Sequence, residues 1–329
     1  MKKIINKKTV IIAIGLLILI SFAVLLLSPQ TEALSATGVN WTKYSGNPLN
    51  LGTGQASRPW VIREGHTYKM WYTMLDAGED AEKICFADSS DGINWATHGA
   101  VLIGGSWDTC VLKPVVLHDG ATYTMWYIGA PAGSPVGKVG YAISADGIHW
   151  AKRASPVLVP GGNGGWDDFT ISNFAVLFNG TNYTMWYSAE DGSAGTTRIG
   201  VATSTDGVSW TKYSDNPVME PIPNSWESGH VWAGPVLKNG SQYVMWYTGQ
   251  TRDYPSRIGV ATSPDGFSWS RYPDNPVLGV GPTGSWDSLA IVSSSVVRDG
   301  NRLLMFYYAS DGQAVRIGLA ESDRHGHGC

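Results

Sequence analysis

The sequence has little charge and almost no cysteine. Only 15% of its 329 residues are charged, against roughly 25% in an ordinary soluble domain, and the formal net charge is -4. A nucleic-acid surface needs an excess of Lys and Arg, so nucleic acid is excluded as an expected partner. Three cysteines allow at most one disulfide, for which Cys85 and Cys110 are candidates. Packing rather than a disulfide framework must therefore stabilise the fold.

Gly and aromatic residues are abundant instead. The chain has 40 Gly, 15 Trp and 15 Tyr, and 43% of its residues are hydrophobic. This apolar content is too high for a disordered chain. The surplus of Gly, Pro and aromatic residues disfavours a helical bundle and favours many short strands joined by tight turns.

The first 36 residues differ from the rest. Four lysines precede an uncharged stretch over residues 10–27, which is long enough for the core of a signal peptide or for a membrane-spanning helix. The sequence leaves these two alternatives open. Both predict one N-terminal hydrophobic helix and an extracytoplasmic body, either secreted or anchored to the outer face of the cytoplasmic membrane.

A repeat dominates the remaining sequence. The pattern Tyr-x-Met-Trp-Tyr occurs four times and returns in a weaker form as Leu303–Tyr307. The central aromatic residues of these copies are Trp71, Trp126, Trp186, Trp246 and Phe306. Their spacing of 55, 60, 60 and 60 residues predicts five structural units.

Each unit reads as four strands. An apolar strand ending in a Gly turn precedes the Met-Trp-Tyr strand, and an Ile-Gly-x-Ala strand follows it. The third strand ends in Ser-x-Asp-Gly, a tight-turn sequence, and a Trp then begins the outer strand. Four antiparallel strands in about 60 residues are typical of one propeller blade.

The two ends of the repeat region complement each other. The fifth unit stops after its third strand, and the segment beginning at Trp41 resembles the outer strand that begins at Trp210. We therefore predict an all-β, five-bladed β-propeller over residues 37–322, closed by the N-terminal strand, with a flexible tail at 323–329. The tail holds His325, His327 and Cys329, but a frayed terminus is the better interpretation, and we expect neither a metal site nor a cofactor.

These motifs resemble the five-bladed propeller glycosidases, a superfamily that includes arabinanases, levansucrases and invertases of glycoside hydrolase families 43 and 32, with the related mannoside phosphorylases. The resemblance rests on the Met-Trp-Tyr strands and the Asp-Gly-x-x-Trp hairpins, from Trp41 to Ser322. It implies a site at one end of the central channel, with carboxylates from different blades. The usual catalytic motifs are not matched, because the corresponding positions read Arg58-Pro59 and Ala233-Gly234-Pro235.

Acidic residues before the inner strands are the catalytic candidates. Trp-Asp or Trp-Glu pairs recur there, and their carboxylates have either a structural role in each blade or a role at the axis. Glycoside hydrolysis uses one carboxylate as base or nucleophile and a second as acid. Our candidates for these two roles are Asp168 and Glu227, with Asp108 as a stabilising group.

Residues that break the repeat are the candidates for substrate contacts. Arg58, Lys113 and Asn173 lie 13 residues before the central aromatic, and His230 lies 16 before it. Charged and polar groups on an inner strand favour a water-filled channel, where they would bind sugar hydroxyls. Trp60 and Trp232 are candidates for stacking on a sugar ring, although packing between blades explains a Trp equally well.

The leading hypothesis is a monomeric, exported or membrane-tethered propeller that binds a polysaccharide or oligosaccharide in its channel and hydrolyses it. A non-catalytic surface module that binds carbohydrate or protein is the alternative, and the missing motifs favour it. Glycoside phosphorolysis is a third possibility, because Arg, Lys and His can hold phosphate. The sequence thus leaves open whether the protein is an enzyme.

Overall fold

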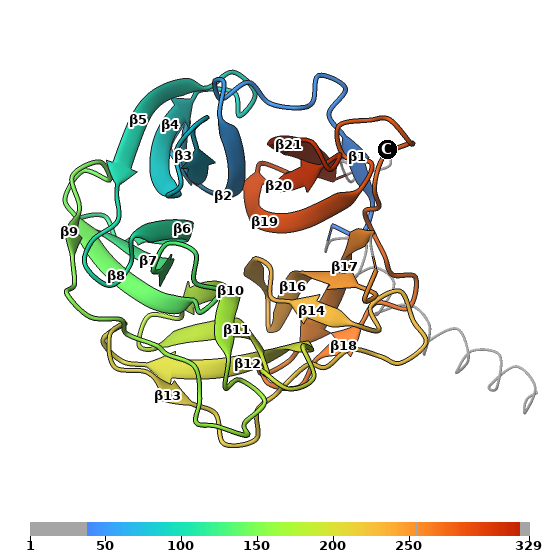
Figure 1. The fold of residues 1–329 in the computed structure, drawn as a ribbon. Coiled ribbons are helices and arrows are strands. Elements are labelled where there is room, and N and C mark those ends of the chain that lie inside the picture. The colour runs from blue at the N-terminus through green and yellow to red at the C-terminus, as the bar shows by residue number, and fades with distance from the viewer. Residues whose placement is uncertain (1–37, 254, 323–329) are drawn as a thin grey trace, which may run out of the picture.

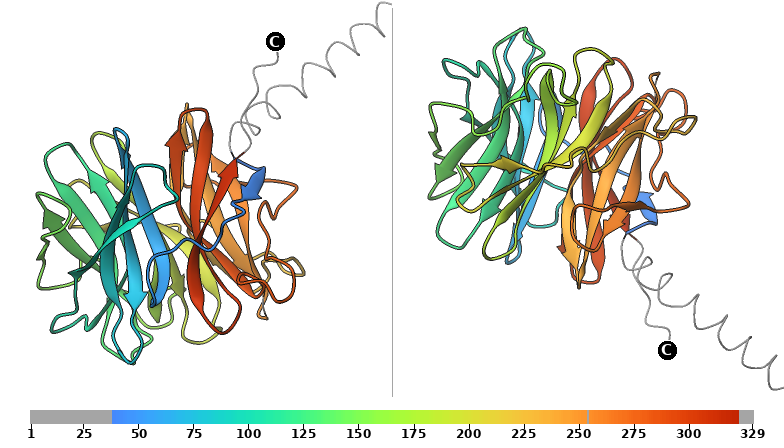
Figure 2. Two further views of the ribbon diagram at one scale, coloured as in Figure 1. Left: turned by 90° about the horizontal axis from the view of Figure 1, so that it is seen from above. Right: turned by 90° about the horizontal axis from the view of Figure 1, so that it is seen from below.

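The computed structural model describes residues 38–253 and 255–322, and within them every regular element is a β-strand. The all-β prediction is therefore confirmed. The predicted hydrophobic helix at the N-terminus and the tail at 323–329 lie outside the described residues. Figure 1 shows the strands gathered into groups around a central axis, and Figure 2 shows these groups from above and below.

Five strand groups, numbered here along the chain, hold the described strands. Group 1 consists of β2 (Gln55–Glu64), β3 (Thr67–Leu75), β4 (Lys83–Ser89) and β5 (Ala96–Leu102). Group 2 consists of β6 (Cys110–His118), β7 (Tyr123–Ala130), β8 (Lys138–Ser144) and β9 (Ala151–Lys152). Group 3 consists of β10 (Thr170–Phe178), β11 (Tyr183–Glu190), β12 (Thr197–Ser204) and β13 (Thr211–Lys212).

Groups 4 and 5 depart slightly from this plan. The inner strand of group 4 is split, so the group consists of β14 (His230–Trp232), β15 (Val236–Asn239), β16 (Gln242–Gln250), β17 (Ser256–Ser263) and β18 (Ser270–Arg271). Group 5 consists of β19 (Ala290–Asp299), β20 (Arg302–Ser310), β21 (Val315–Ser322) and the N-terminal strand β1 (Trp41–Lys43). Strand β1 pairs antiparallel with β21, and Trp41 lies opposite Ser322.

The tight turns form as their sequence predicts. In group 1, Asp91 Oδ1 accepts hydrogen bonds from the backbone N–H groups of Ile93 and Asn94. Gly92 adopts a φ of 76°, in the left-handed region that favours glycine. The turn thereby fixes the start of the outer strand.

The central tryptophans join each group to its neighbour. Trp71, Trp126 and Trp186 are fully buried. Each indole N–H donates to the carbonyl of a turn glycine in the next group, namely Gly147, Gly207 and Gly266. Trp246 donates in the same way to Gly38, which precedes β1. The N-terminal segment therefore takes the place of the turn that group 5 does not have.

Candidate functional site

The inner strands are irregular at the same point in each group. The pairing register shifts at Ser57/Trp60, Leu112/Val115, Ile171/Asn173 and Ser293/Ser295, and the inner strand of group 4 is interrupted between Trp232 and Val236. Arg58 and Lys113 lie within these irregularities, with φ of 50° and 54°. Non-glycine residues rarely adopt such values, and β-bulges re-aim side chains at functional sites.

Hydroxyl groups from the preceding group hold two of these irregular segments. Thr73 Oγ1 accepts a hydrogen bond from the backbone N–H of Lys113 at 2.9 Å. Ser188 Oγ does the same for Ala233 at 2.7 Å. Because all four residues are buried, these bonds satisfy backbone donors that the interrupted strand pairing leaves free.

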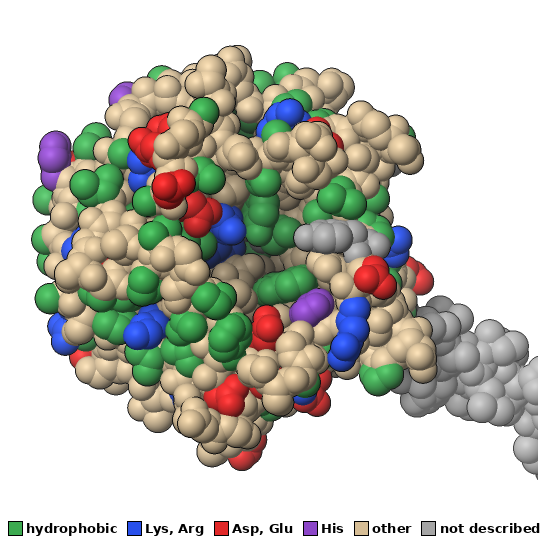
Figure 3. All heavy atoms as spheres, in the orientation of Figure 1, with side chains coloured by type: hydrophobic (Ala, Val, Ile, Leu, Met, Phe, Trp, Pro, Cys, Tyr) green, Lys and Arg blue, Asp and Glu red, His purple; other side chains and the backbone are tan. Residues whose placement is uncertain are grey.

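A cavity of about 390 Å³ lies at this level of the molecule. Three of the predicted contact residues line it, Arg58, Asn173 and Trp232, together with Gln250 and Tyr308. Figure 3 shows that this face of the molecule is hollowed near its centre. The cavity lies near the small end of the roughly 300–1,000 Å³ range of ligand pockets.

Arg58 is fixed in the cavity wall as a cation. Its Nη1 lies 2.7 Å from Glu82 Oε1, and its guanidinium carbon lies 5.7 Å from the ring centroid of Tyr308. Burial alone would lower the pKa of Arg58, but the interactions with Tyr308 and Glu82 raise it above the ordinary value.

Lys113 is buried beside this cation. Burial, and next to it the charge of Arg58, lower the pKa of the Lys113 ammonium to about 7. Near neutral pH the side chain is therefore divided between its charged and neutral forms.

His230 and Trp232 form a stacked pair in β14. Their ring centroids lie 5.1 Å apart with an interplanar angle of 13°. Nδ1 of His230 is hydrogen-bonded to Thr197 Oγ1 at 3.1 Å. Burial, and then the charge of Arg252, lower the pKa of His230, which favours the neutral imidazole. His230 thus supports Trp232 at the cavity.

Asn173 and Trp60 have different surroundings. Asn173 is buried, and its Oδ1 accepts a hydrogen bond from the backbone N–H of Phe174 at 3.0 Å. Trp60 lies in the hydrophobic core, where its indole N–H donates to the carbonyl of Val116 at 2.7 Å. These contacts agree with the second alternative for Trp60, in which the ring packs between neighbouring groups and does not stack on a sugar.

The recurring acidic residues before the inner strands occupy equivalent clusters in groups 2 to 5. In each cluster a buried carboxylate is ion-paired with a cation from an outer strand. The pairs are Asp108–Lys152 at 2.8 Å, Asp167–Lys212 at 2.6 Å, Glu227–Arg271 at 2.5 Å and Asp287–Lys43 at 2.6 Å. In groups 2 and 3 the tyrosine of Met-Trp-Tyr also donates to the carboxylate.

These clusters favour a structural role for Asp108 and Glu227. Neither residue is among the described residues that line the cavity, and both are almost fully buried. Burial raises the pKa of Glu227 despite the opposing attraction of Arg271. A cluster that recurs in four groups stabilises the groups themselves, as one alternative from the sequence supposes.

Asp168 lies apart from these clusters. Its two carboxylate oxygens accept hydrogen bonds from the backbone N–H groups of Gly192 and Gly164. These two bonds, in that order, lower the pKa of Asp168. The residue connects two loops of group 3, and it is not among the described cavity-lining residues.

Sequence reasoning missed Glu190, the last residue of β11. It lies four residues after the central aromatic, and Gln250 and Ser310, which occupy the same position in groups 4 and 5, both line the cavity. Burial, and then the nearby Asp191, raise the pKa of Glu190. No hydrogen bond or ion pair to its carboxyl occurs among the described residues. The signal was available, because this position also breaks the repeat.

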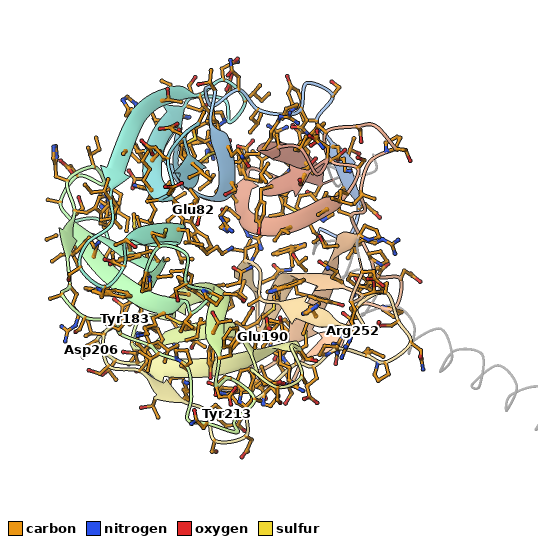
Figure 4. The ribbon with its side chains drawn as sticks, in the orientation of Figure 1. Glu82, Tyr183, Glu190, Asp206, Tyr213 and Arg252 are labelled. Atoms are coloured by element: carbon orange, nitrogen blue, oxygen red, sulfur yellow. The ribbon has the colours of Figure 1, made fainter. Side chains whose placement is uncertain are left out.

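Glu82, the ion-pair partner of Arg58, is a second acidic residue that the sequence analysis did not single out. Figure 4 labels Glu82 and Glu190 in different strand groups on either side of the central opening, with Arg252 farther from it. The structure therefore places two carboxylates outside the repeated clusters around the central opening, although neither is among the described cavity-lining residues.

Three further features of the described part of the chain are its cysteines, its potential metal ligands and its potential membrane helices. Cys85 and Cys110 are free thiols there. Residues 38–253 and 255–322 contain no group of three or more His, Cys, Asp or Glu side chains placed to hold a metal ion. The same residues include no helix long and apolar enough to cross a bilayer.

One sequence comparison points to a particular carbohydrate-active family. A model of glycoside hydrolase family 130, described as beta-1,4-mannooligosaccharide phosphorylase, matches residues 173–281, about a third of the chain. This match corrects the resemblance inferred from the motifs, which named families 43 and 32 first. The mannoside phosphorylases, which the motifs placed only as related proteins, are the better comparison.

Curated relatives cover part of the chain. An uncharacterized protein, MT1551, from Mycobacterium tuberculosis (strain CDC 1551 / Oshkosh) is 28% identical over 201 residues. The alignment covers 57% of this chain and 65% of that protein. The chain therefore spans just under two thirds of the length of this relative.

Solved structures share the fold. A chain described as a glycoside hydrolase has a TM-score of 0.72 at 22% identity, covering 85% of this chain and 91% of that one. The beta-1,2-mannobiose phosphorylase from Listeria innocua, solved with beta-1,2-mannobiose, has a TM-score of 0.70 at 13% identity, covering 86% and 97%. At such identities the likeness concerns the fold alone, that of a carbohydrate-active β-propeller.

Proposed function

We propose that this protein is a carbohydrate-active enzyme that hydrolyses a mannoside in the axial cavity, with Glu190 as the proton donor. The observation that carries the proposal is the environment of Glu190. Its half-buried carboxyl has a raised pKa and lies at the position whose counterparts, Gln250 and Ser310, line the cavity. The repeated carboxylates, by contrast, are already ion-paired with outer-strand cations.

The chemistry of glycoside cleavage requires such a group. As the bond to the leaving sugar breaks, its oxygen must receive a proton, and a carboxyl with a raised pKa keeps its proton to a higher pH than an ordinary glutamate does. Glu82 is the candidate for the second carboxylate. Its ion pair with Arg58 fixes its position on the other side of the opening. In this arrangement Glu82 activates water or stabilises the developing positive charge on the sugar.

The cavity supplies contacts for a sugar. Arg58 and Gln250 present hydrogen-bonding groups, and Trp232 presents an aromatic surface supported by His230. Polar groups that fix orientation beside an aromatic surface are typical of small-molecule sites. The family match supports a mannoside as the sugar.

Phosphorolysis is a second candidate, supported by the neighbouring positive charges of Arg58 and Lys113. Guanidinium and ammonium groups are the usual partners of phosphate. Lys113 is partly neutral near pH 7 and Glu82 offsets the charge of Arg58, so we favour water as the acceptor.

The deciding experiment offers the purified protein beta-1,4- and beta-1,2-mannobiose, with and without inorganic phosphate. We expect release of free mannose without phosphate, and a loss of at least about 100-fold in kcat for Glu190→Gln. Formation of mannose 1-phosphate only when phosphate is present would establish the second candidate. Binding without cleavage would indicate a carbohydrate-binding module and would overturn both hydrolysis and phosphorolysis.

The catalytic candidates from the sequence enter the same experiment as variants. If Glu227→Gln and Asp168→Asn keep the native kcat while Glu190→Gln loses it, the assignment of the proton donor stands. If Asp168→Asn loses activity and Glu190→Gln does not, the assignment reverts to the earlier candidate.

We also propose that the fold is a closed five-bladed propeller and that the protein is exported. The pairing of β1 with β21 and the Trp246–Gly38 hydrogen bond support closure by the N-terminal strand. The basic and apolar pattern of residues 1–36 supports export. Mass spectrometry of the protein from its native cell would distinguish a cleaved signal peptide from an uncleaved anchor.

A further inference from the structure

We infer that the subsite beside the sugar prefers an apolar aglycone, meaning that an alkyl or aryl leaving group binds there more tightly than a second sugar. This inference rests on the proposed function and names the substrate class of the same cavity. It follows from an apolar wall on one side of the cavity, which we define by Leu289, Val292 and Val315.

The apolar wall comes from group 5, which also contributes Ala290, Tyr308, Ala309 and Ser310 to the cavity lining. Val292 belongs to β19 and Val315 to β21, while Leu289 immediately precedes β19. The Leu289 side chain is 37% exposed, and the other two residues are partly exposed. Three aliphatic side chains that face an open cavity leave apolar surface in contact with water, and a bound apolar group would remove it.

The other groups do not repeat this wall. The counterparts of Val315 are Glu82, Gly137, Thr197 and Ser256. The counterparts of Val292 are Ser57, Leu112, Ser172 and Trp232, and those of Leu289 are Gly54, Thr109, Phe169 and Gly229. Only group 5 has an aliphatic residue at all three positions. The repeated architecture therefore does not explain why three aliphatic side chains gather here, whereas a bound apolar group does.

The cavity lining also includes polar residues from other groups. Arg58, Asn173 and Gln250 belong to groups 1, 3 and 4, so the cavity offers contacts for hydroxyl groups as well as for hydrocarbon. A second sugar would place hydroxyl groups against the aliphatic side chains, where they would lose hydrogen bonds to water. A volume of about 390 Å³ suits one sugar with a compact apolar group better than a long oligosaccharide.

The test compares ligands that share the sugar and differ in the aglycone. Dissociation constants of methyl, hexyl and phenyl β-mannoside and of mannobiose are measured by calorimetry with the full protein. We expect hexyl or phenyl mannoside to bind at least roughly tenfold more tightly than methyl mannoside, since even single methylene groups in apolar pockets reach this discrimination. The stronger of the two identifies an alkyl or an aryl aglycone.

Two double variants locate the effect. Leu289→Asn with Val315→Thr should remove most of the preference for the apolar aglycone and change the affinity for methyl mannoside much less. Ile103→Asn with Val159→Thr is the matched control, because these aliphatic residues are also exposed, at 64% and 46%, and are not among the described cavity-lining residues. The control should keep the native preference.

The outcomes separate this inference from the proposed function. If methyl mannoside and mannobiose bind or are cleaved but no apolar glycoside binds better, the inference is overturned and the function stands. If only apolar glycosides bind, and binding requires Leu289, the inference about the apolar wall is supported and the expected cleavage of mannobiose is contradicted. An equal loss of preference in both double variants, or no binding at all, overturns the inference.

Discussion

Two sets of carboxylates in this molecule have opposite environments. Asp167 and its counterparts are buried in ion pairs with outer-strand cations, and tyrosine hydroxyls donate to two of these carboxylates. Glu190 is half-buried at the position whose counterparts in groups 4 and 5 line the cavity, with no ion pair among the described residues. The first set recurs in four groups and the second does not. Recurrence thus marks groups that hold the fold, while single occurrence marks groups available for chemistry.

A buried tryptophan and a cavity-lining tryptophan can be compared in the same way. This comparison has the largest expected effect on the free energy of unfolding. Trp126 is fully buried and Trp232 lines the cavity. Trp126→Ala should lower the free energy of unfolding by about 3–5 kcal/mol, because it leaves a large cavity in the core. Trp232→Ala should lower it much less and weaken sugar binding instead. Urea denaturation and calorimetry measure the two effects, and equal losses of stability would contradict the distinction.

The paired aspartates 167 and 168 provide a sharper test. Asp167→Asn should lower the free energy of unfolding by about 2 kcal/mol, because it removes the charge that compensates Lys212. This is below the usual range for a buried pair because Lys212 is partly exposed. Asp168→Asn changes the adjacent residue outside the cluster and should cost less stability. A larger loss for Asp168→Asn would show that the clusters are not structural.

Glu190→Gln should separate stability from activity. The raised pKa of Glu190 means that the folded state binds its proton more tightly than the unfolded state, so its contribution to stability falls as pH rises through the folded pKa. A neutral glutamine avoids this loss, and the variant should be slightly more stable than the native protein near neutral pH. Activity should decrease by about 100-fold or more. The native pH–rate profile should fall as pH rises through the raised pKa of Glu190.

Lys113→Met should have an effect on stability that appears only as the pH falls below the ordinary pKa of lysine. The folded pKa of Lys113, about 7, lies below the ordinary value of 10.5. Stability is therefore unaffected above the unfolded pKa and decreases as pH falls toward 7, by at most about 1.4 kcal/mol per pH unit. The stability advantage of Lys113→Met should accordingly grow between pH 10 and 7 in denaturation experiments. Lys83→Met, on an exposed ion pair, is the control and should show no such gain.

The repeat made the strands and turns predictable. The third strand, its Ser-x-Asp-Gly turn and the Met-Trp-Tyr strand depend on local patterns, and each is written several times in the sequence. Arg58 and Asn173 were found because they break these patterns on inner strands, and Trp232 was predicted as a stacking residue; all three line the cavity. Glu190 was not predicted, because it lies after the central aromatic on the second strand, whereas the predicted contact residues lie before it on the inner strands.

The sequence by itself determined which segments become strands, since alternating apolar residues and turn glycines act locally. It also identified the positions that the repeat does not explain. Only the tertiary structure decided which carboxylates are already paired. Lys152 and Asp108, or Lys43 and Asp287, are far apart along the chain and meet only when the outer strand of a group joins the sheet that begins after the carboxylate. Burial, the largest influence on the pKa of Glu190 and of Lys113, depends on such long-range neighbours, and no local pattern contains it.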